Sequence, residues 1–298
     1  MSVRTLPYIY GLLVSLAAAQ DANNAYVQKI QKWRHGYEAN LKQDDGWLTL
    51  SGLFWLKEGG NTFGTGVAND IVLPEGSAPD VAGSFTLHDG STRLSAKPGA
   101  AVLLNGAPVL TEMPLKPDSV GRPDRVTLGR RLSMIVIHRS NRYGIRLWDH
   151  GSPARRDFRG TQWFPVDEAY RVTARFVSYA QPKMIAILNI LGDTEPSPSP
   201  GFAVFEIAGQ RCRLEPVLED NQLFFIFKDR TSSKQTYPAG RFLYSALPKD
   251  GKVVMDFNKA TNPPCAFTAY ATCPLPPKQN YLPVAIDAGE LNYGHAKP

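Results

Sequence analysis

The sequence predicts a mainly β protein, with an N-terminal helix followed by two packed antiparallel β lobes. Helical periodicity is confined to the residues before Gly46, and from there on apolar and polar residues alternate with a period of two. Turn-forming Gly, Asn and Pro residues interrupt this alternation at short intervals. The 298 residues, 43% hydrophobic and 20% charged, have the composition of a globular chain long enough for a substantial core.

The first 19 residues have the pattern of a cleaved signal peptide. Arg4 precedes an apolar run from Tyr8 to Ala19, which ends in three alanines before Gln20. The run is shorter than the roughly 20 apolar residues of a membrane span, and no later segment approaches that length. We therefore expect a secreted or periplasmic protein without a membrane span, with a retained N-terminal anchor as the alternative.

Residues 20–45 are predicted to form an amphipathic helix. Large apolar residues recur there at spacings of three and four, with charged residues between them. These residues are Tyr26, Ile30, Trp33, Tyr37 and Leu41. Asp21, Asn23 or Asn24 are expected to cap its start, and Gly46 to follow its end. The apolar stripe predicts a face that docks on the β structure.

Residues 46–150 form the predicted first lobe, which we expect to resemble a sandwich. The expected strands are 47–50, 69–73, 83–87, 101–104 and 132–138. Between two of them, Asn105-Gly106 is the preferred dipeptide of a tight hairpin turn.

Residues 151–298 form the predicted second lobe, which begins at a break within residues 151–160. The expected strands are 170–179, 184–191, 202–207, 211–217, 222–227, 241–244 and 253–257. Their short connections predict an antiparallel meander or barrel.

Motifs along the whole mature chain resemble the family called domain of unknown function 1684. They occupy residues 46–56, 139–149, 163–167, 189–194, 236–241 and 256–277. Because the family has no assigned activity, the resemblance implies no catalytic residue.

Within the first lobe, residues 69–74 and 104–109 also resemble pieces of a forkhead-associated sandwich, a phosphothreonine-binding module. The basic anchor of that family is missing, since Gly64-Thr65-Gly66 stands where a Gly-Arg pair is expected. This second resemblance therefore implies an architecture without phosphopeptide binding.

The segment from Asp256 to Pro277 combines polar side chains with five prolines and three aromatic rings. Asp256, Asn258 and Asn262 alternate near the end of a strand, where a carboxylate and two amides can orient a water or bind a sugar hydroxyl. Alternatively, these side chains bond the backbone of a Pro-rich turn.

Cys265 and Cys273 are candidates for a disulfide in an exported chain, and Cys212 resembles a lone buried thiol. No His forms a local signature with Cys265, and the spacing of the cysteines is unusual for zinc. We therefore expect neither a catalytic thiol nor a metal, and no cofactor.

Arginines are concentrated between positions 139 and 159. If a site exists among them, Arg142 and Arg146 are its best candidates for gripping an anion. Alternatively, the cluster pairs with Asp149, Asp157 and Asp167.

The net charge is +6, and apart from Arg130-Arg131 and this arginine cluster the basic residues are scattered, which disfavours nucleic acid as a partner. Signatures of serine esterases, nucleotide enzymes and zinc proteases are also missing. Our first hypothesis is a protein that binds a small molecule or glycan in a cleft, through Trp163, Arg142, Asp256 and Asn262. The alternatives are a hydrolase that uses Asp256, with Glu290 as the candidate for a second carboxylate, and an envelope-associated structural protein.

Overall fold

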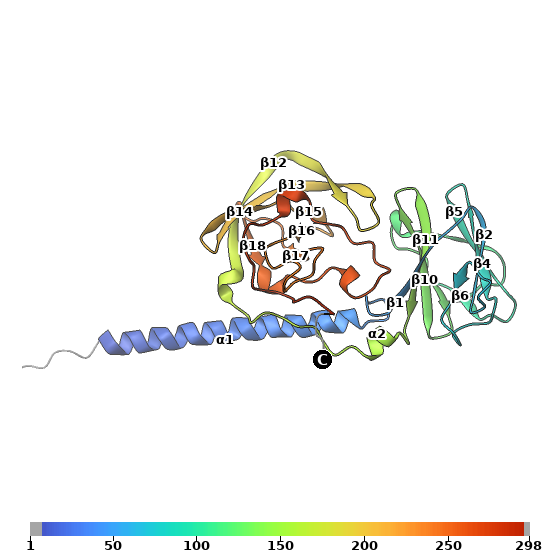
Figure 1. Ribbon diagram of the computed structural model, residues 1–298, viewed down its shortest axis with the longest axis horizontal. Helices are drawn as coiled ribbons and strands as arrows, with labels where there is room; N and C mark the ends of the chain where they lie inside the picture. The colour runs from blue at the N-terminus through green and yellow to red at the C-terminus, as the bar shows by residue number, and fades with distance from the viewer. Residues whose placement is uncertain (1–7, 295–298) are drawn as a thin grey trace, which may run out of the picture. The chain divides into compact units, whose positions relative to one another are not determined.

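The computed structural model describes the backbone of residues 8–294, with side chains from residue 20 onward (Figure 1). The chain divides into two compact units. Residues up to 39, 160–266 and from 274 on form what we call the α1 unit. Residues 40–159 and 267–273 form what we call the sandwich unit. The division between residues 159 and 160 therefore falls at the end of the predicted break at 151–160. Residues 267–273 were expected in the second lobe, but they belong to the sandwich unit.

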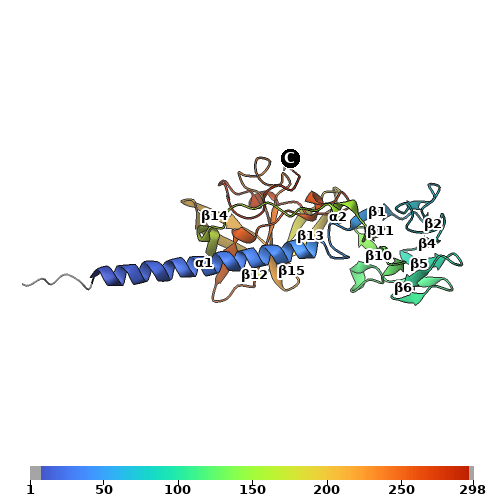
Figure 2. The same ribbon diagram turned by 90° about the horizontal axis from the view of Figure 1, so that it is seen from below.

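Helix α1 spans Tyr8–Leu41 and is unbroken over its length (Figure 2). Tyr26, Ile30 and Leu41 of the predicted stripe are buried. The predicted start was wrong, because the helix continues through Asp21, Asn23 and Asn24 toward its N-terminus. Of the predicted signal peptide, residues 1–7 lie outside the described residues and the rest lies in the first turns of α1. None of the helices that the structure describes has the length and apolarity of a membrane span.

The sandwich unit consists of two sheets, with strand orders β1-β11-β10-β9-β6-β7 and β3-β2-β4-β5-β8. All neighbours are antiparallel except the short parallel pair of β2 and β3. The strands are β1 (Leu50–Trp55), β2 (Gly59–Gly64), β3 (Ile71–Val72), β4 (Gly83–His88), β5 (Ser91–Ala96), β6 (Val102–Leu104), β7 (Ala107–Pro108), β8 (Met113–Leu115), β9 (Val126–Leu128), β10 (Leu132–Arg139) and β11 (Arg142–Asp149). A 3-10 turn η1 (Asp118–Val120) and the one-turn helix α2 (Pro153–Arg156) complete the unit.

Alternation along these strands places their apolar side chains in one core between the sheets. Phe63 and Phe85 from one sheet join Met134 and Ile145 from the other in this core. The predicted sandwich character of this part of the chain is therefore present in the structure. The predicted hairpin at Asn105-Gly106 is confirmed, because it joins β6 to β7 with both residues at positive φ.

The α1 unit contains a four-stranded sheet, β14-β13-β12-β18, and a three-stranded sheet, β15-β16-β17. Its strands are β12 (Arg171–Leu188), β13 (Thr194–Ile207), β14 (Gln210–Leu214), β15 (Val217–Glu219), β16 (Gln222–Phe227), β17 (Arg241–Ser245) and β18 (Lys252–Asp256). The segments outside these strands contain four 3-10 turns, which are η2 (Glu168–Tyr170), η3 (Phe257–Lys259), η4 (Pro264–Ala266) and η5 (Lys278–Asn280). Both sheets contribute to one core, in which Phe205 and Phe227 pack against Phe257.

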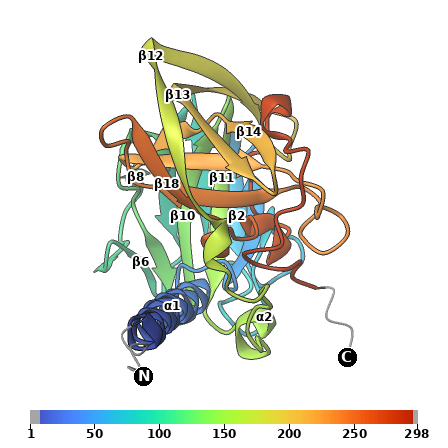
Figure 3. The same ribbon diagram turned by 90° about the vertical axis from the view of Figure 1, so that its left-hand side faces the viewer.

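Strands β12 and β13 are longer than predicted, and their distal halves form a ribbon (Figure 3). Residues 183–188 pair with residues 194–199, because β18 and β14 reach only the proximal halves. At the end of the ribbon, the Leu188 carbonyl also accepts a hydrogen bond from the Leu275 N–H. The two strands predicted at 170–179 and 184–191 are thus one strand with an irregularity between Ser178 and Lys183. The ribbon strand of β13 carries Pro196 and Pro198.

Candidate functional site

The α1 unit has a cleft of about 620 Å³, which we call the lysine cleft. Its walls are helix α1, the residues around the start of β12, strands β17 and β18, which belong to different sheets, and the tight turn between these two strands. Its lining residues are Ala22, Ala25, Tyr26, Lys29, Ile30, Glu168, Arg171, Tyr244, Ser245, Ala246, Leu247, Lys249, Lys252, Val253, Val254, Asp256 and Lys259. Five of these side chains are cationic and two are anionic.

Strand β18 forms one wall because its sequence alternates. Val253 and Met255 point into the core of the unit and are buried. Lys252, Val254 and Asp256 therefore share the opposite face, and all three line the cleft.

Lys249 and Lys252 lie directly opposite each other across the β17–β18 turn. Each backbone N–H donates to the carbonyl of the other, at 2.9 Å in both directions. Such a pair places both side chains on one face of the hairpin, and like charges in this position are destabilising. Neither lysine has a carboxylate within ion-pair distance among residues 20–294. The hairpin thus presents two uncompensated cations to the cleft.

Lys29 and Lys259 supply further cations near α1. The Lys259 ammonium lies 5.8 Å from the ring centre of Trp33, and Lys29 lies one helical turn before Trp33. Within the described part of the chain, neither has an ion-pair partner. Arg171 differs from these lysines, because it lies 3.8 Å from the carboxylate of Glu168.

Asp256 lines the cleft, but its Oδ1 already accepts hydrogen bonds. Tyr26 donates its hydroxyl to this oxygen at 2.9 Å, and the Asn258 side chain donates at 3.2 Å. Asn258 is fully buried, and it also exchanges hydrogen bonds with the backbone of Asp167. Burial first, and the neighbouring Asp256 second, raise the pKa of Tyr26 well above its usual range. Asn258 therefore ties α1 to β18 and does not face a ligand.

Asn262 lies in a different cluster, around the fully buried Glu290. The backbone N–H of Asn262 donates to Glu290 Oε2 at 2.7 Å, and the Tyr37 hydroxyl donates to the same oxygen at 3.1 Å. Trp163 belongs here too, since it pairs with Glu290 through a β-bridge and packs edge-on against Tyr37. None of these residues lines the lysine cleft.

Burial favours the neutral form of the Glu290 carboxyl. Burial raises its pKa to about 8, against the hydrogen bonds from Asn262 and Tyr37 that lower it. Glu290 Oε1 and Asn262 Oδ1 are both buried and have no hydrogen-bond partner among the described residues. A proton on Glu290 gives the carboxyl a donor, which a carboxylate lacks.

Arg142 and Arg146 lie on β11 in the sandwich unit, where they contact tryptophans. The Arg142 guanidinium is 4.3 Å from the ring centre of Trp55, and that of Arg146 is 6.0 Å from Trp47. Burial lowers the pKa of Arg146 to about 10, with a further contribution from Arg139. Both arginines thus have a packing role in this structure.

Three other arginines of the predicted cluster, Arg139, Arg155 and Arg156, form ion pairs, but mostly with partners other than those expected. Arg139 pairs with Asp118, and Arg156 with Asp157 as anticipated. Asp149 is bound bidentately by Arg131, which lies outside the cluster, at 2.8 and 2.9 Å. Asp167 instead caps η2.

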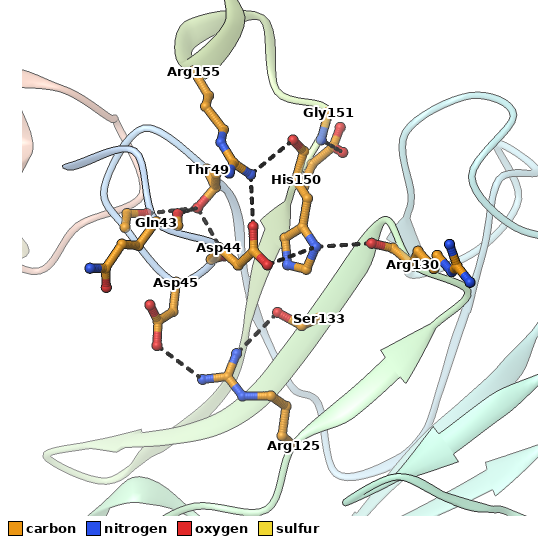
Figure 4. A network of polar contacts seen from close by, with 12 residues as sticks. Gln43, Asp44, Asp45, Thr49, Arg125, Arg130, Ser133, His150, Gly151 and Arg155 are labelled. Carbon is orange, nitrogen blue, oxygen red and sulfur yellow. Dashed lines mark hydrogen bonds and ion pairs between the residues drawn. The ribbon is translucent and has the colours of Figure 1, made fainter. Parts of the chain in front are cut away.

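Arg155 belongs to a polar network that fixes the loop after α1 (Figure 4). It donates to Asp44 Oδ1 at 2.8 Å, and Asp44 lies beside His150. His150 Nδ1 is 3.0 Å from the carbonyl of Arg130. This network joins the loop to the β10–β11 sheet and to α2, so its role is structural.

The three cysteines divide as the sequence suggested. Cys265 and Cys273 are disulfide-bonded, and Cys212 is free and buried in the core of the α1 unit. Burial raises the pKa of the Cys212 thiol, which makes it less nucleophilic.

One group of metal-ligand side chains was not predicted. Glu58, His88 and Asp89 bring ligand atoms within 4.8 Å of one another, and all three are exposed. The contacts within the group are its own ion pairs, with His88 3.0 Å from Glu58 and 3.5 Å from Asp89.

The lysines of the cleft were missed by the sequence analysis. Lys29 and Lys252 are more than 200 positions apart, and nothing local connects them. One signal was available in Lys249-Asp-Gly-Lys252, because Asp-Gly is a preferred two-residue hairpin turn. Asp250 and Gly251 do have positive φ, and that turn places the flanking lysines opposite each other.

A family model described as "Protein of unknown function (DUF1684)" matches residues 156–291. This match confirms the resemblance that the motifs predicted, and it contains most of the lysine cleft and Glu290. The motifs at 46–56 and 139–149 lie outside it, as does the forkhead-associated likeness, which stays a prediction.

An uncharacterized protein of Haloarcula marismortui, solved by NMR, is among the similar structures. It is 31% identical in sequence, with a TM-score of 0.40, and the alignment covers 48% of this chain and 82% of that one. A comparison with curated proteins returned no significant match.

Proposed function

We propose that the α1 unit is a binding module for a small organic anion, which it holds in the lysine cleft. The observation that carries this proposal is the directly opposed pair of Lys249 and Lys252. A bound carboxylate or phosphate would offset their repulsion and form charge-assisted hydrogen bonds with both.

The charge balance of the cleft supports the same ligand class. Its two carboxylates are engaged within the protein, since Glu168 lies beside Arg171 and Asp256 accepts from Tyr26. Four lysines remain without a carboxylate partner among the described residues. An anion therefore meets cations whose charge the protein does not neutralise.

Calorimetric titration of the full chain with phosphate, acetate and benzoate tests the proposal. Lys252→Glu should weaken the binding of the most tightly bound of these anions by about tenfold or more. The reason is that the substitution replaces one charge-assisted hydrogen bond with a repulsion between like charges. Lys234→Glu is the matched control, since Lys234 is exposed in the same unit and does not line the cleft. Equal losses in both variants would reveal non-specific attraction, and no binding by any anion would favour a structural role.

Hydrolysis of a bound ester or glycoside is a second candidate function, because Asp256 and Glu168 both line the cleft. Glu290, the second carboxylate considered from the sequence, is fully buried outside it. Turnover of nitrophenyl esters and glycosides that vanishes in both Asp256→Asn and Glu168→Gln would support an enzyme. Binding without turnover would leave the protein as a binding module.

Export remains part of the proposal, on the support of the sequence pattern before Gln20. Expression in a secreting host followed by mass spectrometry of the intact protein tests it. A mature chain that begins at Gln20 is expected, and an uncleaved chain retained on the membrane would indicate the N-terminal anchor.

A further inference from the structure

We infer that the lysine cleft takes an extended dianion, in which two anionic ends are joined by an apolar span. This inference rests on the proposed function, and it specifies the chemical class of the anion.

The cations of the cleft lie at two ends of the exposed face of β18. Lys252 begins the strand and has Lys249 opposite it, while Lys259 is the last residue of the turn η3 that follows the strand. From Lys252 to Asp256 the strand rises by about 13 Å. Lys29 joins the Lys259 end, because both lie next to Trp33. A compact anion such as phosphate is too small to contact both ends at once.

Between these ends the cleft is lined by exposed apolar side chains. Val254 is 46% exposed at the middle of β18, and Tyr244 and Leu247 are 46% and 42% exposed. Tyr244 is held in place by stacking on Phe224 and by its hydrogen bond to Glu219. Large apolar side chains cost free energy when they face water, and an apolar ligand would remove that cost.

The opposite wall is also apolar. Ala22 and Ala25 are exposed on α1 and line the cleft, one helical turn before Tyr26 and Lys29. Their small side chains leave room beside β18. Asp256 and Glu168 also line the cleft, but Tyr26 and Arg171 engage these carboxylates. The remaining groups are cationic, apolar and cationic in this order, which is complementary to an α,ω-dicarboxylate.

The test compares sebacate with decanoate, which has the same carbon chain and one carboxylate, and with succinate, which has two carboxylates and a short chain. Calorimetry on the full chain should give sebacate at least about tenfold tighter binding than either acid, because only sebacate engages both ends. Lys252→Glu and Lys29→Glu should each reduce sebacate affinity to that of decanoate. Lys234→Glu is the control and should leave all three affinities unchanged.

The possible results distinguish a failure of the dianion inference from a failure of the proposed anion-binding function. Equal binding of sebacate and decanoate would overturn the dianion while leaving an anion site. Equal binding of sebacate and succinate would overturn the apolar span. Failure of every acid to bind would overturn the site itself. Because Lys29 lies on α1, Lys259→Gln supplies a second variant at that end, and unchanged circular dichroism shows that each variant folds.

Discussion

The α1 unit contains two polar regions of opposite character. Around Glu290, the polar groups are buried, the carboxyl is kept neutral, and the donors Tyr37 and Asn262 belong to the chain itself. In the lysine cleft, charged groups are open to solvent and four of the cations have no carboxylate partner in the described part of the chain. The difference teaches that buried polar groups find their partners within the fold at Glu290, whereas the cleft leaves cations without carboxylate partners in the described part of the chain.

The largest effect should come from the charge state of Glu290. Its pKa is about 8 in the folded protein and 4.5 in a model peptide, so the folded state binds the proton more tightly. Its stabilising contribution is complete below pH 4.5, falls as the pH rises toward 8, and is absent above. Between pH 4.5 and pH 8, the free energy of unfolding therefore falls by roughly 3–5 kcal/mol.

Glu290→Gln keeps a neutral side chain at every pH and should remove this loss. Urea unfolding of both proteins between pH 4 and 9 measures it, as the difference between their free energies of unfolding. The variant should become the more stable protein above pH 8. If the free energies of unfolding of both proteins changed in parallel with pH, Glu290 would be ionised in the folded state. The contrast between a neutral buried carboxyl and the charged cleft would then disappear.

An intermediate effect is expected at the hydrogen bonds that join α1 to β18. Tyr26→Phe removes the donor to Asp256 and the acceptor for Asn258, at a cost of about 1–2 kcal/mol in the free energy of unfolding. Tyr281→Phe is the control, because Tyr281 is exposed and its hydroxyl makes no hydrogen bond to the described residues. A similar loss in both variants would contradict a specific role for Tyr26.

The smallest effect has the opposite sign. Lys249→Glu converts the opposed lysines into an ion pair and should raise the free energy of unfolding by about 0.2–1 kcal/mol. The same change should weaken anion binding. Urea unfolding at low salt, with Lys234→Glu alongside, measures the gain. A destabilised variant would show that Lys249 already has a compensating role in the fold.

The fold was largely predictable because its signals are local. The stripe from Tyr26 to Leu41 and the period-two alternation after Gly46 each follow from neighbouring residues. The start of α1 was not predictable in this way. Asp21 and Asn23 are favourable capping residues, but they do not end a helix when the residues before them are helical as well. The length of β12 was missed because Pro182 and polar neighbours resemble a turn, while the pairing with β13 continues beyond them.

The candidate site was predictable only in part. Asp256 does line a cleft, but its neighbours Asn258 and Asn262 are buried in separate hydrogen-bond clusters. A polar residue near a strand end has the same sequence signature whether it bonds a ligand or the backbone. The lysines come together only through the packing of α1 on β18, which no local pattern records.

The prolines of the β12–β13 ribbon have a consequence for self-association. Pro196 and Pro198 alternate on β13, so the backbone positions that face away from β12 have no N–H to offer. A two-stranded ribbon with an open outer edge is otherwise a template on which strands of other molecules add and start aggregates. Serine in place of both prolines would restore those donors, so we expect that variant to self-associate more readily than the natural sequence.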